Sequence, residues 1–191
     1  MNIQAVPVGE LQTNCYILSQ GEQSPTVLLV DPGDEGDKIL AALQGREVAA
    51  VLLTHGHFDH TGALPLFADK PLYIHEDDIP ILNDPLRNGS SYSDDRRPRP
   101  EKAIALHEGD VVAGAGLRLT VLSTPGHTPG SVCYLSQDNQ LLSGDTLFAS
   151  GYGRTDLPGG SMLKMRQSLR RLFQYHGVLF YPGHGPAGRL Q

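Results

Sequence analysis

Residues 54–60 read Thr54-His55-Gly56-His57-Phe58-Asp59-His60, so four side chains of metal-binding type fall within six residues. The segment directly follows the apolar run 49–53, which predicts a strand. Side chains two residues apart on an extended backbone point the same way, which pairs the first two histidines. The aspartate and the last histidine can then reach a neighbouring point. Because this is more than a chance His-X-His pair, we expect the segment to contribute ligands to two metal ions.

Three further candidate ligands, His127, Asp145 and His184, each follow an apolar, strand-like run and lie in a glycine-containing turn. Taken alone, each is typical of an ordinary turn residue. Taken together they are informative, because in open α/β sheets ligands bind at the edge where strands end. We therefore expect all seven side chains to meet at one site. The alternative is a polar surface loop whose histidines are unconnected with the later residues.

The number of candidate ligands indicates two ions. One zinc ion takes about four protein ligands in a structural site and about three, with a water, in a catalytic site, so seven exceed what one ion needs. Asp145 belongs to neither histidine cluster, and its two carboxylate oxygens favour it as a bridge. Imidazole and carboxylate ligands suit zinc, iron and manganese. We expect two divalent metal ions, zinc foremost.

The rest of the chain predicts strands alternating with a few helices, an order that suits helices covering sheets in a layered α/β fold. A helix is expected after a cap at Asp34 and ending at Gly45, another from a cap at Ser161 to about residue 174, and a short one around residues 64–67. Residues 83–103 predict a long loop, which in a compact domain is often functional. The expected strands are 2–8, 15–18, 27–30, 48–54, 71–75, 117–123, 131–135, 140–143 and 178–181.

Composition limits the function classes. The 191 residues fit one domain, 1–191, and contain no stretch of about 18 apolar residues that could cross a membrane. A net charge of -6 disfavours nucleic acid as a partner, and the arginine-rich segment 96–99 is predicted to be a solvated loop. Cys15 and Cys133 are expected to be reduced thiols in the core. Without a leader pattern, a cytoplasmic location is the expectation; the oligomeric state is left open.

These residues resemble the metallo-β-lactamase superfamily. Its His-X-His-X-Asp-His motif appears at 55–60, and its later His, Asp and His match His127, Asp145 and His184. The resemblance runs along nearly the whole chain. Finer features are similar to the glyoxalase II-like branch of small hydrolases, namely Asp31-Pro32-Gly33, Gly144-Asp145-Thr146-Leu147-Phe148 and Gly153-Arg154-Thr155-Asp156.

The resemblance implies an αββα four-layer sandwich with the metals at one edge. It implies that the first metal is held by His55, His57 and His127, the second by Asp59, His60 and His184, and that Asp145 is shared. An aspartate rather than a cysteine near the bridging position is unlike the zinc β-lactamases, so antibiotic hydrolysis is not expected. In glyoxalase II a basic residue matching Arg154 meets the carboxylate of the thiol, and a tyrosine two positions later assists; here that position is Asp156.

Together these features predict a metal-dependent hydrolase, foremost a thioesterase acting on S-acyl, S-lactoylglutathione-like small molecules. Two ions can lower the pKa of a bridging water toward about 7 and so supply hydroxide, which Asp59 would orient. A thiolate leaves without an acid because thiols have a pKa near about 8.5. Arg154 is the candidate for binding a substrate carboxylate, with a surface salt bridge as the alternative, and Tyr152 is the candidate for lining the pocket, with a core or loop aromatic as the alternative. His75 and Asp31 are candidates for orienting metal ligands.

Three alternatives stay open. A mononuclear-iron persulfide dioxygenase is similar in this branch and shares the Gly-Arg-Thr-Asp stretch at 153–156. Cleavage of RNA phosphodiesters is possible on the same scaffold, although the acidic charge argues against it. A non-catalytic metal-binding protein is the third, but structural zinc sites are closed and usually rich in cysteine, whereas this ligand set has none.

Overall fold

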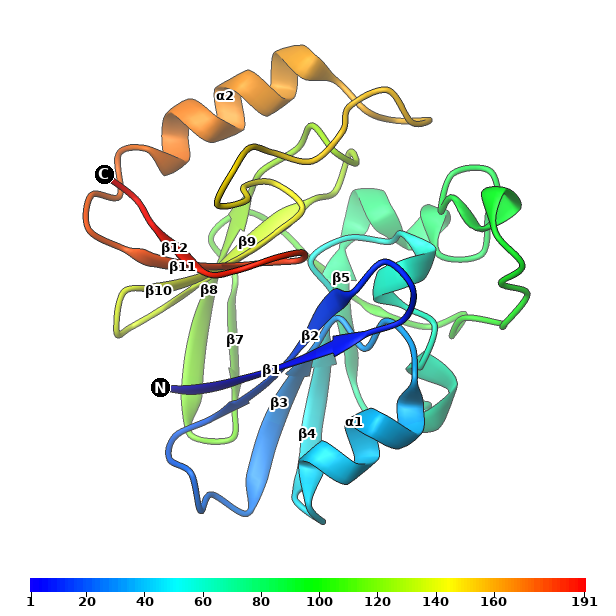
Figure 1. The fold of residues 1–191 in the computed structure, drawn as a ribbon, viewed down its shortest axis with the longest axis vertical. Coiled ribbons are helices and arrows are strands. Elements are labelled where there is room, and N and C mark those ends of the chain that lie inside the picture. The colour runs from blue at the N-terminus through cyan, green and yellow to red at the C-terminus, as the bar shows by residue number, and fades with distance from the viewer.

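Two β-sheets packed face to face form the centre of the molecule, and one α-helix covers the outer face of each (Figure 1). The computed structural model describes residues 1–191. The arrangement is the αββα sandwich of a single domain, so the fold prediction is confirmed.

In both sheets, strands that are consecutive in the chain are neighbours in the sheet. In the first, β3 to β6 run parallel to one another, and β1 and β2 extend the sheet in antiparallel fashion. In the second, β10 and β11 are parallel and the other pairs antiparallel. The first sheet comprises β1 (Asn2–Val8), β2 (Thr13–Ser19), β3 (Thr26–Val30), β4 (Glu47–Leu52), β5 (Leu72–His75) and β6 (Ile104–Leu106). The second comprises β12 (Gly188–Arg189), β11 (Leu179–Pro182), β10 (Gln140–Gly144), β9 (Val132–Ser136), β8 (Leu117–Ser123) and β7 (Val111–Gly114).

Three apolar clusters separate the four layers. Alternate side chains of a strand point to opposite faces, so in β2 Ile17 packs toward α1 (Gly36–Leu43) and Leu18 packs between the sheets. A third cluster lies between the second sheet and α2 (Met162–Leu172) and includes Leu141 and Leu172. Because the central strands are buried on both faces, their sequences are almost continuously apolar. This is why the sequence reveals them clearly.

Each α-helix buries only part of its apolar pattern: Ile39 and Leu43 are buried in α1 and Met165 and Leu172 in α2, whereas Leu40 and Met162 are exposed. Only one of the two helices has the expected cap. In α2 (Met162–Leu172) the Ser161 hydroxyl accepts a hydrogen bond from the Lys164 amide at 3.4 Å, as predicted. In α1 (Gly36–Leu43) the predicted cap at Asp34 is wrong, because the helix begins after Glu35 without a side-chain cap. Asp34 instead accepts a 2.6 Å hydrogen bond from Arg97, a long-range contact that outweighs the local preference.

Most of the short elements were not predicted. The predictions omit the strands β6, β7 and β12, and of the four 3₁₀ helices they include only η2. These helices are η1 (Phe58–His60), η2 (Leu64–Phe67), η3 (Glu76–Ile81) and η4 (Ser90–Tyr92).

Residues 83–103 contain no strand, as expected of a loop. The expectation that segment 96–99 is solvated is wrong for Arg99, whose side chain is 3% exposed and pairs with Asp95. Arg99 also donates to the Thr61 hydroxyl at 3.0 Å, so it ties the loop to the body of the protein.

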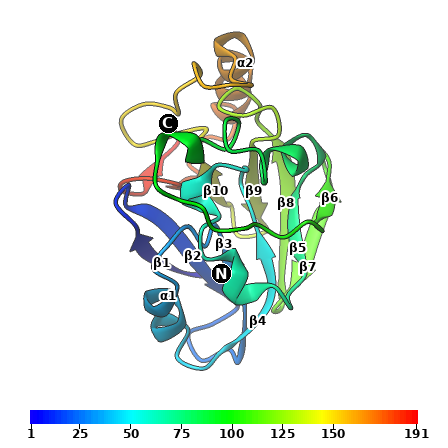
Figure 2. The ribbon, with the colours of Figure 1, turned by 90° about the vertical axis from the view of Figure 1, so that its right-hand side faces the viewer.

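Figure 2 shows that β6 and β7, consecutive in the chain, lie at the same side of the molecule, where the chain passes from one sheet to the other. Both cysteines are buried and free, as predicted. None of the helices combines the length and hydrophobicity that crossing a membrane requires.

Candidate metal centre

The seven predicted ligands come from four strand ends and meet at one edge of the sandwich. His55 and His57 lie just after β4, and η1 places Asp59 and His60 immediately beyond them. The later residues follow strands of the second sheet: His127 lies in the turn between β8 and β9, Asp145 follows β10, and His184 follows β11. The structure therefore brings all seven side chains together, although they span 130 positions from His55 to His184.

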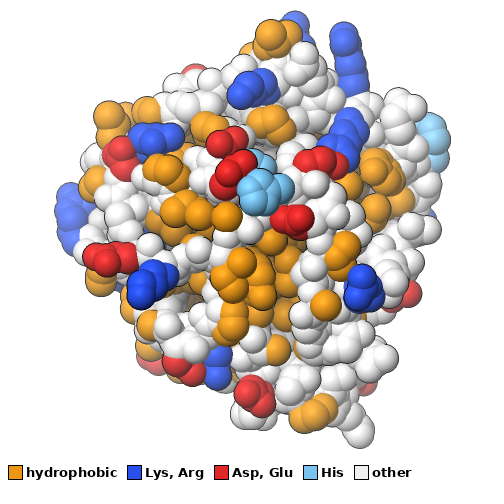
Figure 3. All heavy atoms as spheres, turned by 180° about the vertical axis from the view of Figure 1, so that it is seen from behind, with side chains coloured by type: hydrophobic (Ala, Val, Ile, Leu, Met, Phe, Trp, Pro, Cys, Tyr) orange, Lys and Arg blue, Asp and Glu red, His pale blue; other side chains and the backbone are white.

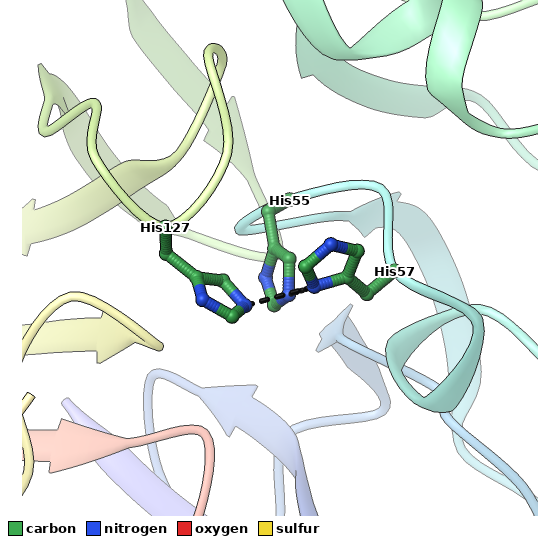
Figure 4. A group of neighbouring side chains, drawn as sticks. All are labelled: His55, His57 and His127. Carbon is green, nitrogen blue, oxygen red and sulfur yellow. Dashed lines mark hydrogen bonds between the residues drawn. The ribbon is translucent and has the colours of Figure 1, made fainter. Parts of the chain in front are cut away.

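Three buried imidazoles form the first ligand group (Figure 4). Nδ1 of His57 lies 3.1 Å from Nε2 of His55 and 2.8 Å from Nε2 of His127. In a tetrahedral zinc site with bonds of about 2.0–2.1 Å, ligand atoms lie about 3.3 Å apart. The three nitrogens are thus spaced like three ligands of one ion.

Asp59, His60 and His184 form the second ligand group. Oδ2 of Asp59 lies 3.4 Å from Nε2 of His60 and 3.3 Å from Nε2 of His184. Asp145 lies between the two groups: one carboxylate oxygen is 3.4 Å from Nε2 of His60, and the other is 3.5 Å from Nε2 of His127. Its carboxylate therefore faces both groups, as a bridging ligand would.

Hydrogen bonds on the far side of the rings fix how three of the histidines point. Nδ1 of His60 donates to the Asp31 carboxylate at 2.9 Å, Nδ1 of His127 to the Arg154 carbonyl at 2.7 Å, and Nδ1 of His184 to the Leu11 carbonyl at 3.0 Å. When the ring is neutral, this hydrogen bond leaves the free lone pair on Nε2, which is the arrangement usual for metal-binding histidines. The rings are therefore oriented in advance toward the space between them.

Asp31 and His75 were expected to orient metal ligands. Asp31 contacts one of the seven ligands, and His75 contacts none. Asp31 accepts from His60 and also from the amide and hydroxyl of Thr54, at 2.8 and 2.7 Å. Asp31 thus joins the end of β3 to the segment 54–60, which carries four of the ligands. His75 has no hydrogen bond with any of the seven residues; it accepts one from the Asp77 amide at the start of η3. The expectation for His75 is therefore wrong, because its ring serves the local turn.

In the first group, His55 and His57 are held neutral. Burial, together with the adjacent His127, lowers the pKa of His57 to about 3. Burial also lowers the pKa of His55 well below its usual value. Neutral imidazole is the form that binds metal, so these rings need not lose a proton first.

In the second group the carboxylates dominate. Burial would lower the pKa of His184, but hydrogen bonds to Asp145 and Asp59 outweigh it and raise that pKa to about 9. Burial would also lower the pKa of His60. The negative charges of Asp59, Asp145 and Asp31 outweigh this effect and raise that pKa well above its usual value. Burial would raise the pKa of Asp59, but His60 and His184 lower it to about 2. The group thus contains ionised carboxylates that attract positive charge.

Two of the converging atoms have no hydrogen-bond partner although they are fully buried: Nε2 of His60 and Oδ1 of Asp145. Buried polar atoms are nearly always paired, and an exception calls for an explanation such as a missing ion. A Cβ on Gly183 would lie 2.1 Å from that same Asp145 oxygen, so only glycine leaves room there. The donor set, its geometry and its unpaired atoms fit divalent metal ions.

A cavity of about 840 Å³ opens above the two groups. Its walls include Arg154 and Asp156, whose side chains form a two-point ion pair with both N···O distances 2.8 Å. Tyr152 does not line this cavity but a separate apolar hollow of about 520 Å³, so the expectation for Tyr152 is wrong. The apolar part of the wall is formed by Leu11, Phe58, Tyr92, Phe148 and Leu157.

Sequence reasoning missed several residues of the site. Tyr92, in the long loop, lines the cavity with 69% of its surface exposed. Thr13 donates its hydroxyl to Asp59 at 2.9 Å. Asp78 is buried and bonds the backbone beside two ligand segments. Only Phe58, inside the motif itself, carried a signal that could have placed it at the cavity.

The chain matches the family model of the metallo-beta-lactamase superfamily over residues 8–184. The probable metallo-hydrolase YqgX of Bacillus subtilis (strain 168) is 40% identical over 195 residues, which cover 97% of this chain and 91% of the relative. The hydroxyacylglutathione hydrolase GloC of Haemophilus influenzae is 28% identical over 97% of this chain and 91% of its own length.

Solved structures are similar over the whole fold. The BLEG-1 B3 metallo-beta-lactamase has a TM-score of 0.90 and 33% identity, covering 99% of this chain and 94% of its own. TTHA1623 in a di-iron-bound form has a TM-score of 0.87 and 37% identity, with coverage of 98% and 94%. ETHE1 from Myxococcus xanthus has a TM-score of 0.72 and 28% identity, with coverage of 100% and 78%.

Proposed function

The chain belongs to the metallo-β-lactamase superfamily, and from that premise we propose that this metallo-hydrolase cleaves the thioester bond of small S-acyl molecules. The observation that carries the proposal is one cavity whose wall contains residues of both ligand groups and Asp145 between them. Its volume of about 840 Å³ suits a small molecule, since ligand pockets typically measure about 300–1,000 Å³. The similarity to a hydroxyacylglutathione hydrolase supports an acylated thiol as substrate.

We propose two metal ions, with His55, His57 and His127 holding the first, Asp59, His60 and His184 holding the second, and Asp145 shared. When bound, such ions supply Lewis acidity toward the scissile carbonyl and hydroxide at neutral pH. Zinc is the first expectation. Iron is the alternative, because a similar solved structure is described as di-iron-bound.

Asp59 is the side chain placed to orient the nucleophile. The Thr13 hydroxyl holds its Oδ2 at 2.9 Å, and its pKa of about 2 keeps it ionised at neutral pH. An ionised carboxylate accepts a hydrogen bond from the attacking water and directs its lone pair toward the substrate. The departing thiolate needs no proton donor, since thiols have a pKa near about 8.5.

The walls of the cavity provide for the organic part of the substrate. Leu11, Phe58 and Phe148 give apolar contact, and Tyr92 adds an exposed aromatic face at the mouth. Arg154 is the proposed contact for an anionic group of the thiol carrier. Because Asp156 already occupies its guanidinium, a carboxylate on the substrate must compete for that contact.

Nucleic acid is not proposed as a substrate. The chain carries a net charge of -6, and on the face in Figure 3 the Lys and Arg side chains are dispersed among acidic and uncharged ones. Affinity for a phosphate backbone depends on clustered cations. A small-molecule thioester therefore remains the proposed partner, in a protein that we propose to be cytoplasmic.

A second candidate is hydrolysis of a β-lactam amide, because BLEG-1, described as a B3 metallo-beta-lactamase, has 33% identity and a TM-score of 0.90. The family resemblance argued against this activity, because an aspartate rather than a cysteine stands near the bridging position. The two reactions share a nucleophile but differ in leaving group, since an amine must be protonated as it leaves and a thiolate need not be.

One experiment separates these functions. Protein of measured metal content is assayed against acyl thioesters of glutathione, of a neutral thiol and of coenzyme A, against a β-lactam and against a phosphodiester, with oxygen uptake recorded on a persulfide. We expect thioester cleavage that the His57→Ala variant loses by at least about 100-fold. Thioester rates equal to those of that variant would contradict the proposal, and oxygen uptake with one iron per chain would replace it with a dioxygenase.

A further inference from the structure

We infer that Asp78 is a positioning residue for the first ligand group: it fixes the segment carrying His55 and His57 against the turn carrying His127. The inference rests on the proposed metal site, and it concerns a residue that touches none of the metal ligands through its side chain. Asp78 lies in η3, one strand away in the chain from the histidine motif, and is fully buried.

The carboxylate of Asp78 joins two segments at once. Its Oδ2 accepts from the Gly56 amide at 2.9 Å and from the Thr128 hydroxyl at 2.7 Å. Its Oδ1 accepts from the Gly130 amide at 2.7 Å. Gly56 lies between His55 and His57, and Thr128 directly follows His127. Two of the three hydrogen bonds therefore involve residues that adjoin ligands, and the third involves Gly130, in the same turn three residues after His127.

The join matters because the two segments belong to different sheets. The histidine motif follows β4 of the first sheet, whereas the His127 turn connects β8 and β9 of the second, and no strand pairing links them. A backbone bond from Val132 to Thr54, 2.9 Å long, ties the sheets before the motif begins. Asp78 supplies the tie beside the histidines themselves, where His57 and His127 approach to 2.8 Å.

The packing around the carboxylate leaves it little freedom. A Cβ on Gly130 would lie 2.7 Å from the Asp78 Oδ1 atom, so the turn approaches more closely than another residue would permit. A buried carboxylate with three donors at 2.7 to 2.9 Å is held in one orientation. Asparagine has nearly the same volume, but its NH₂ group would replace one of the two accepting oxygens and face a hydrogen-bond donor. The histidine segment and the His127 turn must then move apart.

The roles of Asp78 and Asp31 are complementary. Asp31 bonds the ring of His60 directly and also holds Thr54, whose hydroxyl lies 3.1 Å from Nδ1 of His55, whereas Asp78 acts on the first group alone, through Gly56, Thr128 and Gly130. Residues that orient metal ligands in this way typically change metal affinity by about 10–100-fold when replaced. A side chain that served folding alone would weaken both groups equally or neither.

The test measures zinc affinity of each group separately, without substrate. In a His184→Ala background the first group is complete, and in a His57→Ala background the second keeps all its ligands; a chromophoric chelator competes for zinc in both. We expect Asp78→Asn to weaken zinc binding about 10–100-fold in the first background and to leave it unchanged in the second. The visible spectrum of cobalt(II) in the first background should change with it.

Thr128→Val is the companion variant and provides the test if Asp78→Asn does not fold. It removes one of the three hydrogen bonds to Asp78, together with the 2.7 Å hydrogen bond between the Thr128 and Ser131 hydroxyls. It should weaken the first group in the same direction but less, while the circular dichroism of the metal-free protein stays unchanged. Unchanged zinc affinity and cobalt spectrum in the first background, or equal losses in both, would overturn the inference even if thioester cleavage is present. Failure of the thioester assay with a selective loss of zinc would count against the proposed substrate alone.

Discussion

Arg154 and Asp156, two residues apart, hold each other through a pair of 2.8 Å hydrogen bonds at the mouth of the cavity. The guanidinium that would bind a substrate carboxylate is therefore already paired within its own loop. Both side chains are well exposed, so solvent screens the pair and a ligand can compete with it.

Asp156→Asn should make the site more favourable to anionic substrates. With the internal carboxylate removed, Arg154 is free to bind one from the thiol carrier. We expect kcat/KM for a carboxylate-bearing thioester to rise several-fold through a lower KM, while a neutral thioester is unaffected. Equal effects on both substrates would show that the pair does not select by charge.

Asp31→Asn should damage the second ligand group. Asparagine is uncharged, so its amide is a weaker acceptor than the carboxylate for the hydrogen on Nδ1 of His60. The ring of His60 is then held less firmly in its orientation. We expect zinc in the second group to be bound about 10–100-fold more weakly, measured by metal content after dialysis. Retention of both ions at wild-type affinity would contradict this role.

Gly183→Ala should displace Asp145. The added methyl would lie 2.1 Å from its Oδ1 atom and 2.8 Å from Cε1 of His60, so the bridging carboxylate must move. Because Asp145 faces both groups, the variant should lose metal from both and with it nearly all activity. Gly21→Ala is the matched control, since nothing lies within 4 Å of that Cβ. Equal metal contents of the two variants would refute the expectation.

The stability of the metal-free protein should depend on pH through His184. Its pKa in the folded state is about 9, above the value of about 6.5 in the unfolded chain. A raised pKa stabilises the fold fully below the unfolded value, and this stabilisation disappears as pH rises through about 9. We expect the Tm of chelator-treated protein to fall between pH 7 and pH 10, and His184→Ala to show a smaller fall. An identical fall in both proteins would assign the effect to other groups.

The site was predictable to the extent that its residues adjoin strong apolar runs. The strands before His55 and Asp145 are buried on both faces over most of their length, so their ends are visible in the sequence, and the ligand spacing is distinctive. By contrast, the Asp34 cap failed because Arg97, far along the chain, captures the carboxylate. Local preferences cannot foresee a competing partner that only the tertiary structure supplies.

Other features could not be read from sequence for related reasons. The partners of Asp78 are two backbone amides and a hydroxyl. Such groups occur throughout the chain, so nothing in the sequence distinguishes Asp78 from an ordinary aspartate. Edge strands such as β6 and β12 have only three and two residues, so they are defined by their neighbours rather than by their own pattern. Tyr152 and Tyr92 lie in loops, and which of them reaches the cavity depends on loop paths.

The first ligand group takes two members from one sheet and the third from the other. An ion bound there would span the interface between the halves of the sandwich, and the halves could not separate without releasing it. Escape of the ion and rupture of the fold would then share one activation barrier. The lifetime of the native protein, rather than its equilibrium stability alone, would thus be set by how tightly three histidines hold a cation.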